Sequence, residues 1–106
     1  MERAGFLLKV RQDRLAEYKR KHEDVWPEML EALRRHGWRN YSLFMDEDGR
    51  LFGYVEADQS LEKSLEGMSA EEVNLKWQSE FAPFFESLSG RPDQSMVKLE
   101  RVFHMD

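Results

Sequence analysis

Residues 17–30 read EYKRKHEDVWPEML, and this stretch organises the rest of the chain. Its Tyr18, His22 and Trp26 are four residues apart, a spacing that aligns side chains along one face of a helix. Pro27 cannot donate a backbone hydrogen bond, so we expect one helix to stop here and a second to begin with Pro27 in its first turn. Aromatic residues at helical spacing are more often a core stripe than a site. His22 is nevertheless the natural acid/base candidate, because imidazole exchanges protons near pH 7.

The composition is typical of one soluble globular domain. The chain has 106 residues, of which 41% are hydrophobic and 35% charged, which argues against a disordered chain. The net charge of −5, with basic residues interleaved among acids, argues against a nucleic-acid partner. No apolar run approaches the ~20 residues that span a bilayer, and no apolar export signal is present, so we expect no membrane partner and a cytoplasmic location. Without cysteine there are no disulfides or thiolate metal sites.

Apolar alternation and breaker residues predict the elements of the first half. We expect a strand over residues 3–10, a helix capped by Asp13, and a second helix from Pro27 to Gly37, where glycine supplies the left-handed closing position. Strands over 38–45 and 50–57 form a hairpin around the acidic turn that ends at Gly49. Strict alternation in the first of these strands divides its residues between two faces. One face would carry Trp38, Asn40, Ser42 and Phe44, and the other Arg39, Tyr41, Leu43 and Met45.

The second half predicts two helices and a last strand. A short helix over residues 58–65 would be capped by Asp58 or Ser60 and closed by Gly67. Ser69 and Glu72 have the spacing of a capping box, so we expect the next helix to start there and to run toward Pro83. Residues 90–95 read as a polar loop, and residues 96–103 as a strand anchored by Val97, Leu99 and Phe103.

The resulting order is β-α-β-β-α-β, which predicts an α+β, ferredoxin-like fold with an antiparallel sheet. Such a sheet carries helices on one face only, so its other face must meet water, a ligand or another subunit. The many aromatic residues make a second sheet a plausible cover. We therefore expect a homodimer in which two sheets pack face to face.

Few residues of this chain suit the common catalytic chemistries. The three histidines are far apart in sequence and have no metal-ligand spacing, so no metal site is predicted. There is no glycine loop for phosphates and no activated nucleophile motif. What remains is His22 with tyrosines and tryptophans that could line a cavity. A histidine, phenols and aromatic walls suit proton transfer on a small neutral molecule, and a sugar fits well.

The stretch Tyr18-x-x-x-His22-x-x-x-Trp26-Pro27-Glu28 resembles the signature of L-rhamnose mutarotases. Supporting pieces lie along nearly the whole chain: His36-Gly37, Asn40-Tyr41-Ser42, the acidic hairpin, Trp77 and Val102-Phe103.

The resemblance implies one domain over residues 1–106, of the ferredoxin-like, dimeric α/β-barrel type. It implies a homodimer that interconverts the α and β anomers of L-rhamnose without a cofactor. In the family, the residue matching His22 is the proton donor, and those matching Tyr18, Tyr41 and Trp77 contact the sugar. A Trp-Trp pair of the family reads Lys76-Trp77 here, so Lys76 either bonds a hydroxyl or points to solvent.

Two other readings stay open at this point. Haem-degrading or cofactor-free monooxygenases share the dimeric fold, and some place Asn, His and Trp in one pocket; this chain has Asn40, His22 and Trp77. A non-catalytic sugar-binding module would bind L-rhamnose without accelerating anomer exchange. Trp77 itself has a simpler interpretation as a core residue of its helix.

Overall fold

The computed structural model describes residues 1–86 and 90–106. Its elements follow one another in the predicted β-α-β-β-α-β order, with each helical segment split in two. They are β1 (Glu2–Lys9), α1 (Leu15–Lys21), α2 (Pro27–Arg35), β2 (Trp38–Met45), β3 (Arg50–Ala57), α3 (Leu61–Ser69), α4 (Glu72–Phe81) and β4 (Val97–Leu99), with short 3-10 turns at Gln12–Arg14, Ala82–Phe84 and Pro92–Gln94. None of the described helices is long and apolar enough to cross a membrane.

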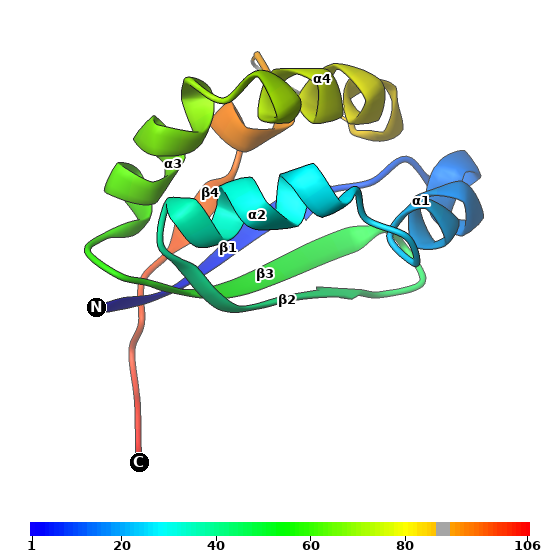
Figure 1. The fold of residues 1–106 in the computed structure, drawn as a ribbon. Coiled ribbons are helices and arrows are strands. Elements are labelled where there is room, and N and C mark those ends of the chain that lie inside the picture. The colour runs from blue at the N-terminus through cyan, green and yellow to red at the C-terminus, as the bar shows by residue number, and fades with distance from the viewer. Residues whose placement is uncertain (87–89) are drawn as a thin grey trace.

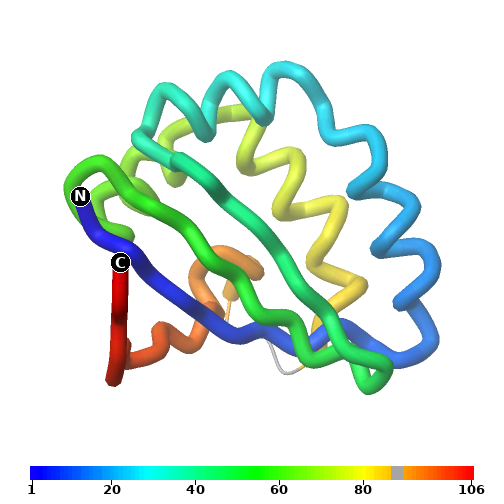
Figure 2. The backbone as a smooth tube through the Cα atoms, turned by 90° about the horizontal axis from the view of Figure 1, so that it is seen from below, coloured from blue at the N-terminus to red at the C-terminus, as the bar shows by residue number. Residues whose placement is uncertain are grey.

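The four strands form one antiparallel sheet in the order β2-β3-β1-β4. All four α-helices of the described chain lie over one face of this sheet, and the other face is open (Figure 1). Seen from the open side, the long strands run across the front with the helices behind them (Figure 2). The prediction of an α+β fold with an antiparallel sheet and one-sided helices is therefore confirmed.

The break at Pro27 has the predicted form. Pro27 is the first residue of α2, and Trp26 before it is in an extended conformation (ψ 132°). Because proline has no N–H to lose at this position, it starts a helix without cost. At the other end of α2, Gly37 has φ +80° and turns the chain into β2, as predicted. Residues 22–26 connect the two helices, and His22, the first of them, directly follows α1.

A bulge in β2 overturns the predicted alternation of its side chains. The pairing with β3 shifts register between Arg39 and Ser42, and Asn40 has φ +46°. An extra residue in a strand reverses the face of those that follow. Trp38 and Tyr41 therefore lie on the same, helix-covered side, with ring centroids 4.8 Å apart. Periodicity could not show this, because a single residue in the left-handed region breaks the count.

Two of the predicted helix boundaries are wrong. Gly67 does not close the first of these helices: α3 continues to Ser69, and a Cβ at Gly67 would overlap the His36 ring, so the glycine permits close packing. Ser69 does not cap α4, because its hydroxyl donates to the Glu66 carbonyl at 2.6 Å. Glu71 occupies the N-cap, and its side chain accepts no hydrogen bond from the backbone of the helix. Of the two candidate caps for α3, Ser60 is the one used, accepting from the Lys63 N–H at 3.1 Å.

The predicted cap at Asp13 and the predicted length of the last strand are also wrong. Asp13 caps neither the 3-10 turn nor α1; its carboxylate accepts from Arg11 at 3.1 Å instead. The last strand is only Val97–Leu99, paired to the edge of β1, and Phe103 lies beyond it with 78% of its surface exposed. The alternating apolar residues near the C-terminus thus predicted a longer strand than the three residues that pair with β1.

Candidate functional site

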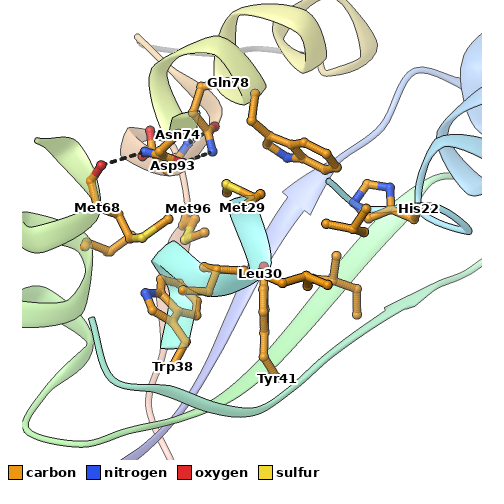
Figure 3. A pocket seen from close by; sticks show the side chains of 15 residues that line it. His22, Met29, Leu30, Trp38, Tyr41, Met68, Asn74, Gln78, Asp93 and Met96 are labelled. Carbon is orange, nitrogen blue, oxygen red and sulfur yellow. Dashed lines mark hydrogen bonds between the residues drawn. The ribbon is translucent and has the colours of Figure 1, made fainter. Parts of the chain in front are cut away.

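A cavity of about 370 Å³ lies between the sheet and the helices (Figure 3). This volume is in the range of small-molecule sites. The walls are mostly apolar and aromatic, with a few polar groups. Its lining includes His22, Val25, Met29, Leu33, Trp38, Tyr41, Leu43, Leu65, Met68, Asn74, Trp77, Gln78, Asp93 and Met96.

His22 is held at one side of this cavity by the end of α1. It is the residue directly after the helix, and its Nδ1 lies 3.0 Å from the carbonyl oxygen of Tyr18. The same carbonyl also accepts from the backbone N–H of His22 at 3.3 Å, so one oxygen holds both the backbone and the ring of His22. A carbonyl only accepts, so Nδ1 carries the proton and donates it. In the neutral ring Nε2 is then left with its lone pair free, ready to accept a proton.

Burial keeps His22 neutral at pH 7. Desolvation lowers the pKa of His22 below its ordinary 6.5, and the hydrogen bond to the Tyr18 carbonyl only partly opposes this. The cause is that a charged imidazolium loses hydration among the surrounding rings. Nε2 is consequently a base at rest, and it becomes an acid only after it has taken a proton.

Tyr18 packs against His22. Only 6% of the Tyr18 surface is exposed, and its ring lies 4.3 Å from the His22 ring, centroid to centroid. Phe81 and Phe85 meet the phenol ring edge-on. Tyr18 does not line the main cavity but an adjoining one of about 60 Å³, which His22 also borders. Burial raises the pKa of the Tyr18 phenol, so it stays protonated.

Trp77 and Tyr41 form two walls beside His22. Trp77, on α4, meets the His22 ring edge-on at 5.6 Å and is stacked on Phe81. Tyr41 reaches the cavity because of the bulge in β2, and burial raises the pKa of its phenol. Trp26 packs edge-on against Trp77 at 4.9 Å and is absent from the lining, as the core interpretation predicts.

Two residues singled out from the sequence lie away from the cavity. The Lys76 side chain is 70% exposed and its ammonium is 3.8 Å from Glu72 one turn earlier. Asn40 is exposed and donates to Glu56 at 3.1 Å. The structure therefore does not bring Asn40 together with His22 and Trp77, the grouping on which the monooxygenase reading depended.

The opposite wall holds three polar residues that the sequence analysis missed. Asn74 and Gln78 lie one turn apart on α4, and Asp93 belongs to the 3-10 turn Pro92–Gln94. Asn74 donates to Asp93 at 3.0 Å and to the Met68 carbonyl at 3.1 Å, while Gln78 donates to Asn74 at 3.0 Å. The i, i+4 spacing of two amides on a helix was a visible signal. Asp93 had no such signal in the sequence, because only the tertiary structure brings its segment to the cavity.

The arrangement is suited to moving a proton on a small polar molecule. It offers one imidazole with a free nitrogen, phenols that remain protonated, and a carboxylate. Within residues 1–86 and 90–106, no group of three or more histidines and acids is placed to hold a metal ion.

Comparison with known proteins gives a consistent match. A family model described as L-rhamnose mutarotase matches residues 3–105. The L-rhamnose mutarotase of Bacillus subtilis (strain 168) is 39% identical, and that of Oceanobacillus iheyensis 38% identical; each alignment covers 100% of both chains. A crystal structure of an L-rhamnose mutarotase from Formosa agariphila superposes with a TM-score of 0.81 at 29% identity, covering 100% of both chains.

Proposed function

The chain belongs to the L-rhamnose mutarotase family, and from this premise we propose how its site interconverts the α and β anomers of L-rhamnose. The substrate is a small neutral sugar, and the cavity of about 370 Å³ is large enough for one. The observation that carries the proposal is the His22 ring in the cavity wall. Its Nδ1 is bonded to the Tyr18 carbonyl, and its Nε2 has no hydrogen-bond partner among residues 1–86 and 90–106.

The proposed reaction passes a single proton through Nε2 of His22. The neutral ring takes the proton of the anomeric hydroxyl, and the oxyanion collapses to an aldehyde as the bond from C1 to the ring oxygen breaks. The imidazolium then gives the same proton to the ring oxygen, which fits a histidine described in the family as the proton donor. Rotation of the aldehyde and the reverse transfers give the other anomer. Each cycle returns His22 to its neutral form.

Aromatic groups are the proposed sugar contacts. Trp77 offers a face or edge to the C–H side of the ring, and the phenol of Tyr41 stays protonated and is available to bond a hydroxyl. The Tyr18 side chain lines the adjoining smaller cavity, from which it would contact the sugar. Its backbone carbonyl positions His22. We leave Lys76 outside the set of sugar contacts, because its ammonium is in solvent beside Glu72.

Saturation-transfer NMR on L-rhamnose tests the function directly. Trace enzyme is expected to accelerate exchange between the α and β H1 signals above the spontaneous rate. Exchange at the spontaneous rate would contradict the proposal. Binding of L-rhamnose without acceleration would identify a sugar-binding module, and a stoichiometric Soret shift on adding haemin would favour the monooxygenase reading.

We also propose that residues 1–106 form one ferredoxin-like domain that pairs as a homodimer of the dimeric α/β-barrel type. The support is a row of apolar side chains across the open face of the sheet. Registered neighbours on the four strands, Val97, Leu7, Phe52 and Phe44, are all exposed in the single chain. Such a row across four strands is typical of a surface that packs on another sheet.

The oligomeric state is measurable by light scattering after gel filtration. The wild-type chain is expected at twice the mass of its 12.7 kDa monomer. Phe44→Lys places a charge in the row and should shift the protein toward monomer, whereas Lys63→Ala, on the helix side, should not. A monomeric wild type would overturn the dimer proposal and leave the proposed reaction standing.

A further inference from the structure

We propose that Asp93, with Gln78, binds the sugar hydroxyls remote from the anomeric carbon, and so sets which sugars this site accepts. The inference rests on the proposed function and names a recognition role for a part of the cavity that the reaction does not use. Both residues line the main cavity and the smaller one beside it. Of the residues that line the main cavity, Asp93 is the carboxylate.

Asp93 is held by donors but still has acceptor capacity. Its side chain is only 7% exposed. One carboxylate oxygen accepts from Arg91 Nε at 3.1 Å and the other from Asn74 Nδ2 at 3.0 Å. An ionised carboxylate offers about four lone-pair sites, so these two bonds leave room for two more. Two neighbouring hydroxyls of a sugar match that capacity.

Gln78 has one free donor next to this carboxylate. Its carbonyl accepts from the Asp93 N–H at 3.1 Å, and one of its amide hydrogens goes to Asn74 at 3.0 Å. Its second amide hydrogen has no acceptor among residues 1–86 and 90–106. Asn74, by contrast, donates both of its amide hydrogens, one to the Met68 carbonyl and one to Asp93. It is therefore a positioning residue. The wall is thus rigid yet still able to bind hydroxyls.

The position of this wall relative to His22 determines which sugar hydroxyls it can contact. In Figure 3, His22 lies on one side of the cavity and Asn74, Gln78 and Asp93 lie on the other. With C1 and the ring oxygen against His22, a pyranose turns its C3 and C4 hydroxyls toward the far wall. Asp93 would accept from this pair, and Gln78 would donate to one of them.

The test compares residue and hydroxyl deletions in the same exchange assay. Wild type is expected to lose about 10- to 100-fold in kcat/KM on 3-deoxy- or 4-deoxy-L-rhamnose, the range for a hydrogen bond to a charged group. Asp93→Asn should lose a similar factor on L-rhamnose, mainly through KM, and little more on the deoxy sugars. Asp58→Asn, an exposed carboxylate paired with Arg39, is the matched control and should behave as wild type.

Several results would overturn the inference. Wild type that exchanges the deoxy sugars as fast as L-rhamnose contradicts it, even if Asp93→Asn fails to fold. An Asp93→Asn chain that folds, by circular dichroism, and loses kcat equally on every sugar would have a structural or anomeric role instead. Absence of any wild-type exchange on L-rhamnose removes the proposed function and this inference together.

Discussion

The two sides of the cavity are built in different ways. His22 is fixed by one backbone carbonyl and by packing against the Tyr18 and Trp77 rings, and its remaining nitrogen is free. Across the cavity, Asn74, Gln78 and Asp93 fix one another through side-chain hydrogen bonds. A group that must gain and lose a proton is better served by few bonds, whereas a group that recognises hydroxyls gains from a fixed direction. The comparison separates the side that we propose to react from the side that we propose to recognise the sugar.

Removing the imidazole should give the largest effect on the reacting side. His22→Gln keeps a polar side chain of similar size but has no group that titrates near pH 7. We expect about 10²- to 10⁴-fold slower enzymatic exchange, the usual contribution of positioned acid/base help. Saturation-transfer NMR measures the rate, and circular dichroism shows whether the chain is folded. A folded variant with wild-type exchange would take His22 out of the reaction.

The pH dependence should follow the same group. Because burial lowers the pKa of His22 below 6.5 and the proposed reaction starts from the neutral ring, kcat/KM should be flat near pH 7. It should fall up to tenfold per unit below the folded-state pKa. The unfolded chain binds more protons between that pKa and 6.5, so the free energy of unfolding should also decrease as pH falls through this window.

His22→Gln is the control for both pH effects. In this variant, the residual kcat/KM should no longer fall at low pH. The free energy of unfolding, measured with urea at each pH, should change less across the same window. An activity that instead rises as the pH falls would mean that the imidazolium is the resting catalyst.

The bulge that brings Tyr41 into the cavity offers a smaller effect. Asn40 has φ +46°, a conformation that asparagine tolerates and a β-branched residue does not. Asn40→Val should lower the free energy of unfolding by about 1–2 kcal/mol and raise KM by displacing Tyr41. Asn40→Gly loses the same bond to Glu56 but keeps the backbone conformation, so it should retain KM. Equal KM values for the two variants would show that the bulge does not matter for the site.

Lys76 should have the smallest effect of all. Its side chain is in solvent next to Glu72 on the outer side of α4, although Trp77 beside it lines the cavity. Lys76→Ala should change kcat/KM on L-rhamnose by less than about twofold, since exposed ion pairs contribute little. A clear rise in KM for this variant, in the NMR exchange assay, would return Lys76 to the sugar contacts.

The elements that the sequence predicted correctly depend on local chemistry. Pro27, Gly37 and the hairpin turn at Gly49 each act through their own backbone geometry, so their neighbours in the chain are enough to interpret them. On the reacting side, the four-residue spacing of Tyr18 and His22 predicted that the two rings would be neighbours, as they are.

The features that were missed depend on distant parts of the chain. Gly67 was predicted to end a helix, but its lack of a side chain makes space for His36, which follows the end of α2. The alternation of β2 failed at the Asn40 bulge, which its pairing with β3 reveals. Asp93 lies in a loop, and only its bonds to Asn74 and Gln78 on α4 place it at the cavity. The side that we propose to recognise the sugar is therefore a product of tertiary structure.

A crystal structure with L-rhamnose bound tests the central distinction between the two sides most directly. We predict that the anomeric oxygen or the ring oxygen lies within about 2.6–3.2 Å of His22 Nε2, with two remote hydroxyls on Asp93. A sugar bound with its anomeric carbon at Asp93, or outside this cavity, would contradict the account.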